Sequence, residues 1–167
     1  MSISLNETVI AYIGLGSNLA NPIEQIRSAR SMCAALPGVQ ELAFSSLYAS
    51  PPMGPKDQPD YVNAVMSVLT DVSALSLLHN LQRIEHERGR VRTGERWTAR
   101  TLDLDLLLYG EQCINTPELT LPHPGLASRA FVLYPLFEIA PDLNVPVFGL
   151  IADLVAKCPL DGLKRID

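Results

Sequence analysis

Apolar and polar residues alternate, or form short apolar runs, along four stretches that have the length of β-strands. This pattern predicts strands at residues 9–15, 41–48, 61–69 and 101–109. The second and third strands are separated by residues 50–60, which hold four prolines and a glycine and therefore predict a loop. That loop is long for a connection, and long loops often bind ligands.

Two further stretches carry apolar residues at helical spacing. The first helix is predicted to begin at Asn21-Pro22, with Asn21 as the N-cap, and to end near Gly38. Its predicted buried stripe is Ile23, Ile26, Ala29, Cys33 and Leu36. The second helix is predicted to begin at Asp71 or Ser73 and to end at Gly89. Its predicted buried stripe is Leu75, Leu78, Leu81 and Ile84.

The predicted element order is β-α-β-β-α-β, which is typical of an α+β fold with a ferredoxin-like core. In that fold the helices pack on one face of an antiparallel sheet. After the fourth strand, Gly110-Glu111 predicts a turn into a short hairpin partner around Cys113. Short helices are expected at Phe131 to Ile139 and Leu150 to Lys157. We expect residues 1–167 to form a single domain, in which residues 1–8 are a polar lead-in.

Composition narrows the classes of function. The chain has 167 residues, 47% of them hydrophobic, and a net charge of −5, which argues against general affinity for nucleic acid or an anionic membrane. No apolar run has transmembrane length, and the first residues lack the features of a signal peptide. Cys33, Cys113 and Cys158 form no metal or redox motif, which predicts reduced thiols and a cytoplasmic protein.

The candidate chemistry is concentrated in the predicted fourth strand. Its alternation puts Leu102, Leu104 and Leu106 on one face and Asp103 and Asp105 on the other. Two neighbouring carboxylates repel each other unless a cation neutralises them, and hard oxygen ligands suit Mg²⁺. The alternative is an ordinary strand with one buried and one solvated face.

Arginines precede the aspartates in unusual density. Six of the ten arginines lie within eighteen residues that contain no lysine: Arg83, Arg88, Arg90, Arg92, Arg96 and Arg100. The guanidinium fork matches phosphate oxygens, so the segment together with the carboxylates predicts a polyphosphate bound through Mg²⁺. A solvated charged loop is the alternative. No P-loop sequence occurs in the chain, which excludes a P-loop kinase.

The histidines form no metal triad by spacing. His79 and His86 lie seven residues apart on the predicted second helix and are expected at the surface. His123 lies between two prolines in a predicted loop, where both a functional and a purely structural role stay open.

Several motifs, in a fixed order, resemble the 6-hydroxymethyl-7,8-dihydropterin pyrophosphokinase family of folate biosynthesis. They extend from about residue 9 to residue 145, and they are Tyr12-Ile13-Gly14-Leu15-Gly16-Ser17-Asn18-Leu19, Ser50-Pro51-Pro52-Met53-Gly54-Pro55, Gln58-Pro59-Asp60-Tyr61-Val62-Asn63, Arg90-Val91-Arg92, Glu95-Arg96-Trp97-Thr98-Ala99-Arg100-Thr101-Leu102-Asp103-Leu104-Asp105, Leu121-Pro122-His123-Pro124 and Arg129-Ala130-Phe131-Val132-Leu133. Proline at position 124 departs from family members that have tyrosine there, and Ser50 replaces a threonine found in others.

The resemblance implies roles for individual residues. Asp103 and Asp105 resemble the ligands of two Mg²⁺ ions, and Arg90 and Arg100 resemble catalytic arginines on the triphosphate. Residues similar to those around ATP are Gln82, Glu85, Arg92, His123 and Arg129. Residues similar to those around the pterin are Ser50, Pro51, Pro52, Met53, Tyr61, Asn63, Trp97 and Phe131, in which Tyr61 and Phe131 stack on the ring.

The resemblance implies an enzyme that transfers pyrophosphate from ATP to the hydroxymethyl group of the reduced pterin and releases AMP. We expect a monomer whose partners are ATP and the pterin, with no nucleic acid and no membrane. Two alternatives stay open: a ferredoxin-like RNA-binding module, and a catalytically silent domain that binds a nucleotide or pterin.

Overall fold

The computed structural model describes residues 7–18, 21–52, 59–88 and 102–167. Its main sheet has six strands. These strands are β1 (Val9–Ser17), β2 (Val39–Phe44), β3 (Tyr48–Ser50), β4 (Tyr61–Thr70), β5 (Asp103–Tyr109) and β10 (Lys164–Arg165). The helices are α1 (Pro22–Ala34), α2 (Ala74–Glu87), α3 (Ala130–Ile139), α4 (Ile151–Lys157) and the 3₁₀ turn η1 (Leu126–Ser128).

The strand order confirms the ferredoxin-like α+β core. The sheet runs β10-β3-β4-β1-β5, and β2 also pairs with β4. All its pairs are antiparallel, and β1 and β4 are the two central strands. Each helical connection therefore skips one strand, as the predicted β-α-β-β-α-β order requires.

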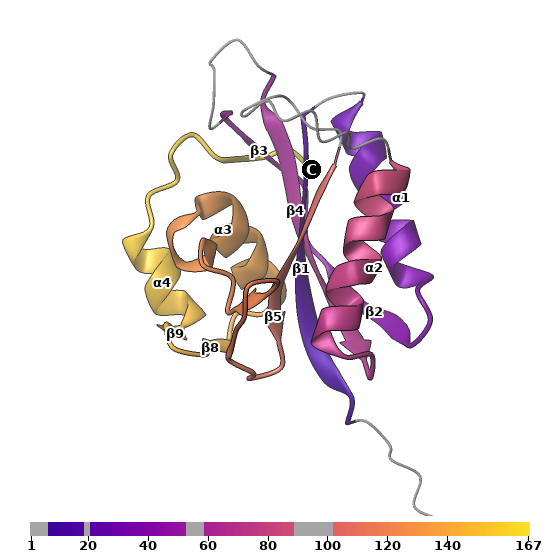
Figure 1. Cartoon of the computed structure of the whole chain (residues 1–167). Helices are drawn as coiled ribbons and strands as arrows, with labels where there is room; N and C mark the ends of the chain where they lie inside the picture. Colours follow the sequence, from indigo (N-terminus) through magenta and orange to yellow (C-terminus); the bar gives the residue numbers. More distant parts are fainter. Residues whose placement is uncertain (1–6, 19–20, 53–58, 89–101) are drawn as a thin grey trace, which may run out of the picture.

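Helices cover both faces of the sheet, so the expectation of helices on one face was incomplete. Figure 1 shows α1 and α2 on one side of the sheet and α3 and α4 on the other. A core against α1 and α2 contains Ala11, Ile13 and Leu15 of β1. A second core against α3 contains Val65 of β4 and Leu107 of β5. The alternate residues of each strand thus serve two separate cores.

A β-bulge lets β5 contribute to both cores. Tyr12 on β1 faces Leu108, but its neighbour Ile13 faces Leu106, so Leu107 has no partner on β1. Leu107 and Leu108 both belong to the α3-side core, whereas Leu106 belongs to the core against α1 and α2. This extra residue explains why the strand ends in a continuous apolar run rather than an alternating one.

The second predicted strand, 41–48, is two strands in the structure. Between β2 and β3 the Ser45 hydroxyl accepts the Val65 N–H (2.9 Å), which takes the place of a regular ladder bond. Glu138 of α3 accepts both the backbone N–H (2.9 Å) and the hydroxyl (3.2 Å) of Ser46. Side chains thus satisfy the backbone where the strand bends, and these contacts join distant segments that no local pattern reveals.

Both central helices begin where the sequence predicts, but details differ. Ser73 caps α2 by accepting the Ser76 N–H, whereas Asn21 has a left-handed backbone and makes no side-chain cap bond to α1. Leu75 was wrongly predicted to be buried and is 40% exposed. It lies nine residues before Ile84, and at 3.6 residues per turn that separation reverses the face of the helix. Ile23 of α1 is likewise exposed.

The C-terminal third adds short elements to this core. The predicted hairpin around Cys113 was wrong in its partner, because β6 (Ile114–Asn115) pairs with β7 (Thr120–Leu121) and not with β5. A second hairpin joins β8 (Asn144–Val145) to β9 (Gly149–Leu150). The predicted short helices are confirmed as α3 and α4. In the described part of the chain, no helix has both the length and the apolar character needed to cross a bilayer.

The last strand, β10, closes the sheet beside β3, and this suggests a test of stability. Leu163, which precedes β10, is 6% exposed and packs with Tyr48 and Ala130. We expect Leu163→Ala to lower the free energy of unfolding by about 2–5 kcal/mol, because it removes buried methyl groups and leaves a cavity. Urea unfolding measures this difference.

The matched control is Leu160→Ala, since Leu160 lies in the same segment but is 51% exposed. Its effect should stay within about 0.5 kcal/mol. Equal losses in the two variants would show that Leu163 is not a core residue.

Candidate active site

The two aspartates form an acidic edge on the α3 side of the sheet. Leu104 and Leu106 point into the core against α1 and α2, so Asp103 and Asp105 point to the opposite face. The Asp105 side chain is 46% exposed, and Asp103 is also partly exposed. Two adjacent carboxylates that solvent and ligands can reach suit a hard cation such as Mg²⁺.

Glycines on the neighbouring strand make the floor of the site. Gly16 and Gly14 of β1 lie opposite Asp103 and Asp105, on the same face of the sheet. On its other side Gly16 faces Asn63, and a Cβ atom at position 16 would lie 3.2 Å from Asn63 Oδ1. Glycine at position 16 thus leaves room for the Asn63 side chain, whereas the Leu107 side chain lies 3.5 Å from the place that a Cβ atom would take at Gly14. Gly14 and Gly16 belong to the first family motif, but the sequence alone assigned them no place in the site.

The opposite edge of the floor is polar and aromatic. Asn63 Nδ2 donates to Ser50 Oγ over 2.7 Å in a buried hydrogen bond, and Ser50 faces Tyr61 across β3 and β4. Tyr61 and Asn63 are alternate residues of β4 and therefore project from the same face. Strands lie about 5 Å apart, so Asn63 and Asp103 are separated across β1 by roughly 10 Å. The structure thus brings three of the predicted pterin residues together, two strands away from the aspartates.

Phe131 and the prolines of the β3–β4 loop border this edge. Phe131 lies in the first turn of α3 and packs against both the α3-side core and a smaller cluster that contains Tyr48 and Leu163. Pro51 is exposed and lies against Gly162, where an added Cβ would be 3.0 Å from Pro51 Cγ. Pro52 is partly exposed. The C-terminal segment therefore supports the loop that carries Pro51.

His123 lies beside Asp105, although the two residues are eighteen positions apart in the chain. The His123 backbone N–H donates to the Leu107 carbonyl on the edge of β5 (2.9 Å), and its Nε2 lies 4.0 Å from Asp105 Oδ1. Its Nδ1 accepts the Gly125 N–H at 3.0 Å, so the proton of the neutral ring resides on Nε2. Burial lowers the pKa of His123, Asp105 opposes that shift, and Arg129 adds to it. The neutral ring thus presents an N–H donor to the acidic edge.

Arg129 is held close to this histidine. Its guanidinium lies over the Phe131 ring, 5.8 Å from the ring centroid, and also lies against Gly125. A Cβ atom at position 125 would be 2.5 Å from Arg129 Nε, so this position requires glycine while the arginine keeps its place. The arrangement sets a permanent positive charge between the aromatic border and His123.

The two predicted nucleotide residues of α2 have different environments. Gln82 is exposed, whereas Glu85 is 5% exposed and its Oε2 accepts the Leu104 N–H at 2.8 Å. Glu85 therefore contacts the backbone of the aspartate strand from the helix side. The remaining predicted site residues lie outside the described residues: Met53, Arg90, Arg92, Trp97 and Arg100.

Glu138 is a contributor that the sequence did not indicate. Its Oε1 accepts the Tyr48 hydroxyl at 2.6 Å, and its Oε2 holds Ser46. It thereby fixes β3, which carries Ser50, against α3. No local signal marks it, because a glutamate near the end of an amphipathic helix is usually solvated.

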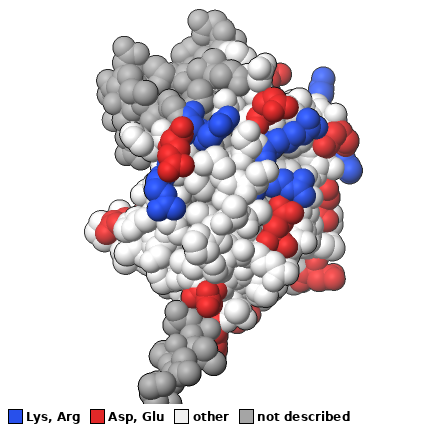
Figure 2. All heavy atoms as spheres, turned by 90° about the vertical axis from the view of Figure 1, so that its right-hand side faces the viewer, with Lys and Arg blue, Asp and Glu red and all other residues white. Residues whose placement is uncertain are grey.

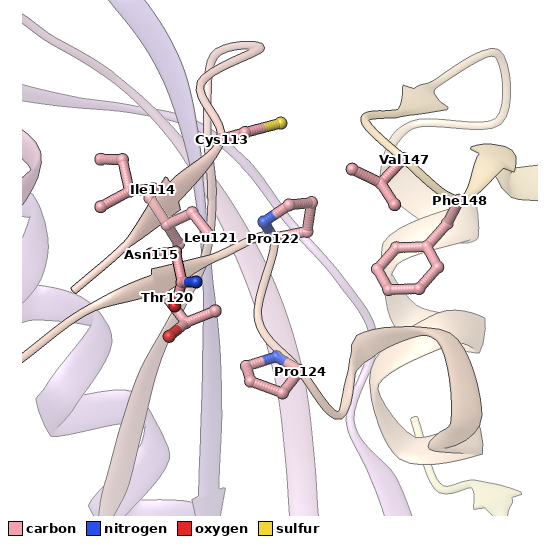
Figure 3. Close-up of a pocket in the computed structure, with 9 residues that line it drawn as sticks. All are labelled: Cys113, Ile114, Asn115, Thr120, Leu121, Pro122, Pro124, Val147 and Phe148. Carbon is pink, nitrogen blue, oxygen red and sulfur yellow. The ribbon is translucent and has the colours of Figure 1, made fainter. Parts of the chain in front are cut away.

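A hollow of about 390 Å³ lies outside this constellation. Figure 3 shows it between the β6–β7 residues and the β8–β9 hairpin, with Val147 and Phe148 facing Pro122. Its lining includes Pro122 and Pro124, the neighbours of His123, but none of the predicted site residues. Among the described residues no three histidine, cysteine or acidic side chains cluster as a metal site. A site of two carboxylates fits Mg²⁺ nevertheless, because this ion commonly takes its other ligands from water and substrate phosphates.

The side of the molecule that α1 and α2 cover carries charges of both signs (Figure 2). Figure 2 shows acidic and basic side chains interspersed over the side that α1 and α2 cover. Arg30, for example, pairs with Glu41 on β2 (2.8 Å), and this bond lowers the pKa of the Glu41 carboxyl. His79 and His86 are exposed, as predicted. The carboxylates, the donors and the glycine floor thus all lie on the α3 side.

Comparison with known proteins identifies the family of the chain. A family model described as 7,8-dihydro-6-hydroxymethylpterin-pyrophosphokinase matches residues 12–141. The 2-amino-4-hydroxy-6-hydroxymethyldihydropteridine pyrophosphokinase of Pseudomonas aeruginosa is 50% identical over 155 residues, which cover 93% of this chain and 95% of that protein. The enzyme of the same name from Haemophilus influenzae is 52% identical over 149 residues, which cover 89% and 92%.

Solved structures agree with the fold. The crystal structure of Plasmodium falciparum HPPK-DHPS with pteroate superposes with a TM-score of 0.74 at 16% identity. The match covers 94% of this chain and 43% of that longer one, and at this identity it establishes the fold alone. The family match and the two close relatives carry the assignment further: the chain belongs to the 7,8-dihydro-6-hydroxymethylpterin pyrophosphokinase family.

Proposed function

We propose that the sheet face between Asp103 and Asp105 on one edge and Tyr61 and Asn63 on the other is the catalytic centre of this pyrophosphokinase. The chain transfers pyrophosphate from ATP to 6-hydroxymethyl-7,8-dihydropterin in folate biosynthesis. The observation that carries the proposal is the register of β1, in which Gly16 faces Asp103 on one neighbouring strand and Asn63 on the other. The two substrates would then meet above the glycine floor.

The acidic edge is the proposed site of the metal and the triphosphate. Asp103 and Asp105 would hold Mg²⁺, and we infer two ions because the family resemblance implies that number. When bound at Asp103 and Asp105, Mg²⁺ would supply positive charge that offsets the negative charge of the phosphates. His123 Nε2–H and Arg129 add fixed donors to the same region, which stabilise an anionic nucleotide without reorganisation.

The polar and aromatic edge is the proposed pterin site. A flat heteroaromatic ring with several donors and acceptors would stack on Tyr61 and Phe131, because aromatic rings stack favourably. Asn63 and Ser50 already hydrogen-bond to each other, so their remaining polar groups have a fixed direction. This arrangement supports recognition of the ring edge without side-chain ordering on binding.

The reaction moves one group and releases one proton. The hydroxymethyl oxygen of the pterin attacks the β-phosphorus of ATP, the bond between that phosphorus and the α,β-bridging oxygen breaks, and AMP leaves. The protein contributes mainly by positioning the two substrates and by the electrostatics of its donors. We assign no general base, since aspartates that hold Mg²⁺ are poor bases.

Three further points complete the proposal. We infer that the chain works as a monomeric, single pyrophosphokinase domain, because all the described parts of the site lie on the main sheet or on the helices and loops packed against it. We also infer a reducing, cytoplasmic setting. The inferred reducing setting is supported by Cys33, Cys113 and Cys158, which are free thiols. Burial raises the pKa of the Cys33 thiol to about 12, which keeps that thiol unreactive.

The decisive assay measures AMP formation from ATP, Mg²⁺ and the reduced pterin. Turnover that needs all three components distinguishes the enzyme from a silent domain that only binds a nucleotide or pterin. Binding of both substrates without AMP would contradict the proposal.

Removal of either carboxylate tests the acidic edge. Asp103→Ala and Asp105→Ala should each reduce turnover by more than about 100-fold, because losing a metal contact costs about 3 kcal/mol or more of transition-state stabilisation. Both variants should fold, since neither side chain points into the leucine core. Steady-state kinetics at saturating Mg²⁺ measures the loss.

The control for the acidic edge is Asp153→Ala, which removes an exposed carboxylate from α4. It should have wild-type kinetics. Near-normal turnover of either site variant at saturating Mg²⁺ would remove the aspartates from the mechanism.

Truncation of the aromatic residues tests the pterin site. Tyr61→Ala and Phe131→Ala should weaken pterin binding, with each stacking contact contributing about 0.5–1.5 kcal/mol beyond its burial. In Tyr61→Ala the affinity for an ATP analogue should change little. Calorimetric titration with each ligand separates the two effects.

Tyr61→Phe is the matched control, because it keeps the ring and should keep most of the pterin affinity. Since Phe131 also packs in the core, its variant needs a thermal melt beside the titration. Parallel losses of nucleotide and pterin affinity in a folded Tyr61→Ala protein would show that the aromatic residues have been assigned to the wrong substrate.

A further inference from the structure

Glu85 is a carboxylate in an unusual place. It lies near the end of α2 between the helix and the sheet, next to the core residue Ile84, and only 5% of it is exposed. Burying a charged group is unfavourable unless strong hydrogen bonds compensate for the lost hydration. Its Oε2 accepts the backbone N–H of Leu104 at 2.8 Å, and this bond is buried.

Leu104 is the residue between the two proposed metal ligands. It faces Leu15 across β1, and its side chain is buried in the core against α1 and α2. Its N–H is donated to Glu85. Among the described residues, β5 is the terminal strand on this side of the sheet, and none of their strands lies beyond it to accept that N–H.

A second contact anchors the same edge of β5 three residues further on. The Leu107 carbonyl accepts the His123 N–H at 2.9 Å. Asp105 therefore lies between two points at which groups outside the sheet hold the strand. An edge strand without such partners frays and twists more easily, and both aspartates would move with it.

We infer that Glu85 is a positioning residue of the metal site, which fixes the pitch and register of β5 so that Asp103 and Asp105 are preorganised for the cation. The inference rests on the proposed function of these aspartates. It assigns Glu85 a role through the strand backbone, in place of the contact with ATP that the sequence comparison implied. Partners that orient metal ligands commonly change metal affinity by about 10–100-fold.

The test compares two replacements that both remove the charge. Glu85→Gln keeps an oxygen that can accept the Leu104 N–H. Glu85→Met is unbranched and apolar, so it suits the buried position but provides no acceptor. Glu87→Met is the matched control, because Glu87 is an exposed glutamate of the same helix.

Two measurements report on each variant. In the metal-free protein, hydrogen exchange of the Leu104 amide should be at least 10-fold faster in Glu85→Met than in wild type, and nearly unchanged in Glu85→Gln. Mn²⁺ binding, followed by electron paramagnetic resonance with a non-hydrolysable ATP analogue, should be about 10-fold weaker in Glu85→Met. Glu85→Gln should stay within about threefold of wild type, and Glu87→Met should match wild type in both measurements.

If Glu85 had a purely structural role, Glu85→Met would be expected to keep its Mn²⁺ affinity, since an apolar replacement of a buried charge often preserves or raises stability. Glu85→Met with unchanged Mn²⁺ affinity and unchanged Leu104 exchange would overturn the inference. If Glu85→Met fails to fold, the Glu85→Gln variant decides the question. A large loss of Mn²⁺ affinity in Glu85→Gln would contradict the inference, because the glutamine can still accept the Leu104 N–H. The Asp103→Ala variant distinguishes failure of the inference on Glu85 from failure of the proposed function. If Asp103→Ala binds Mn²⁺ as tightly as wild type does, the metal site itself is misassigned.

Discussion

The register of β1 between β4 and β5 is the constraint on which the site depends. Antiparallel pairing fixes which residues of three strands share a row, and the two-residue period fixes which face each side chain takes. A slip of one residue on β5 would turn Asp103 and Asp105 into the core and expose Leu104 and Leu106. The energy of burying those leucines therefore also orients the carboxylates, so stability and site geometry have the same origin.

The bulge at Leu107 and the contacts of the edge strand β5 modify the regular alternation of side chains between the two faces of the sheet. The extra residue supplies a second leucine to the α3-side core, and its carbonyl holds the segment that carries His123. One local irregularity thus joins a residue from outside the sheet to the carboxylate edge. The same edge is held from the helix side by Glu85.

Local pattern predicted the elements of the fold but not the contacts between distant segments. The alternation of leucine and aspartate at 102–106 was sufficient to assign the faces of β5, because strand geometry alone determines them. The break at Ser45, the partner of β6 and the burial of Glu85 were not predictable, since each depends on a tertiary contact. Leu75 shows another limit: a spacing of three residues drifts around a helix, so a stripe extended over three steps ends on the opposite face. The family motifs identified Asn63 and His123, but only the structure relates them to Ser50 and Asp105.

The sheet divides the molecule into two regions with different tolerance of sequence change. Residues such as Ile13, Leu81 and Met66 pack behind it against α1 and α2, where repacking alters stability without reaching the open face. Residues such as Tyr48 and Phe131 pack on the same side as the site, where every change in volume also moves a wall of it. Amino-acid substitutions should therefore accumulate over evolution in the core between the sheet and the helices α1 and α2. Glu85 lies on that side but holds the aspartate strand, so it should be substituted less often than its neighbours.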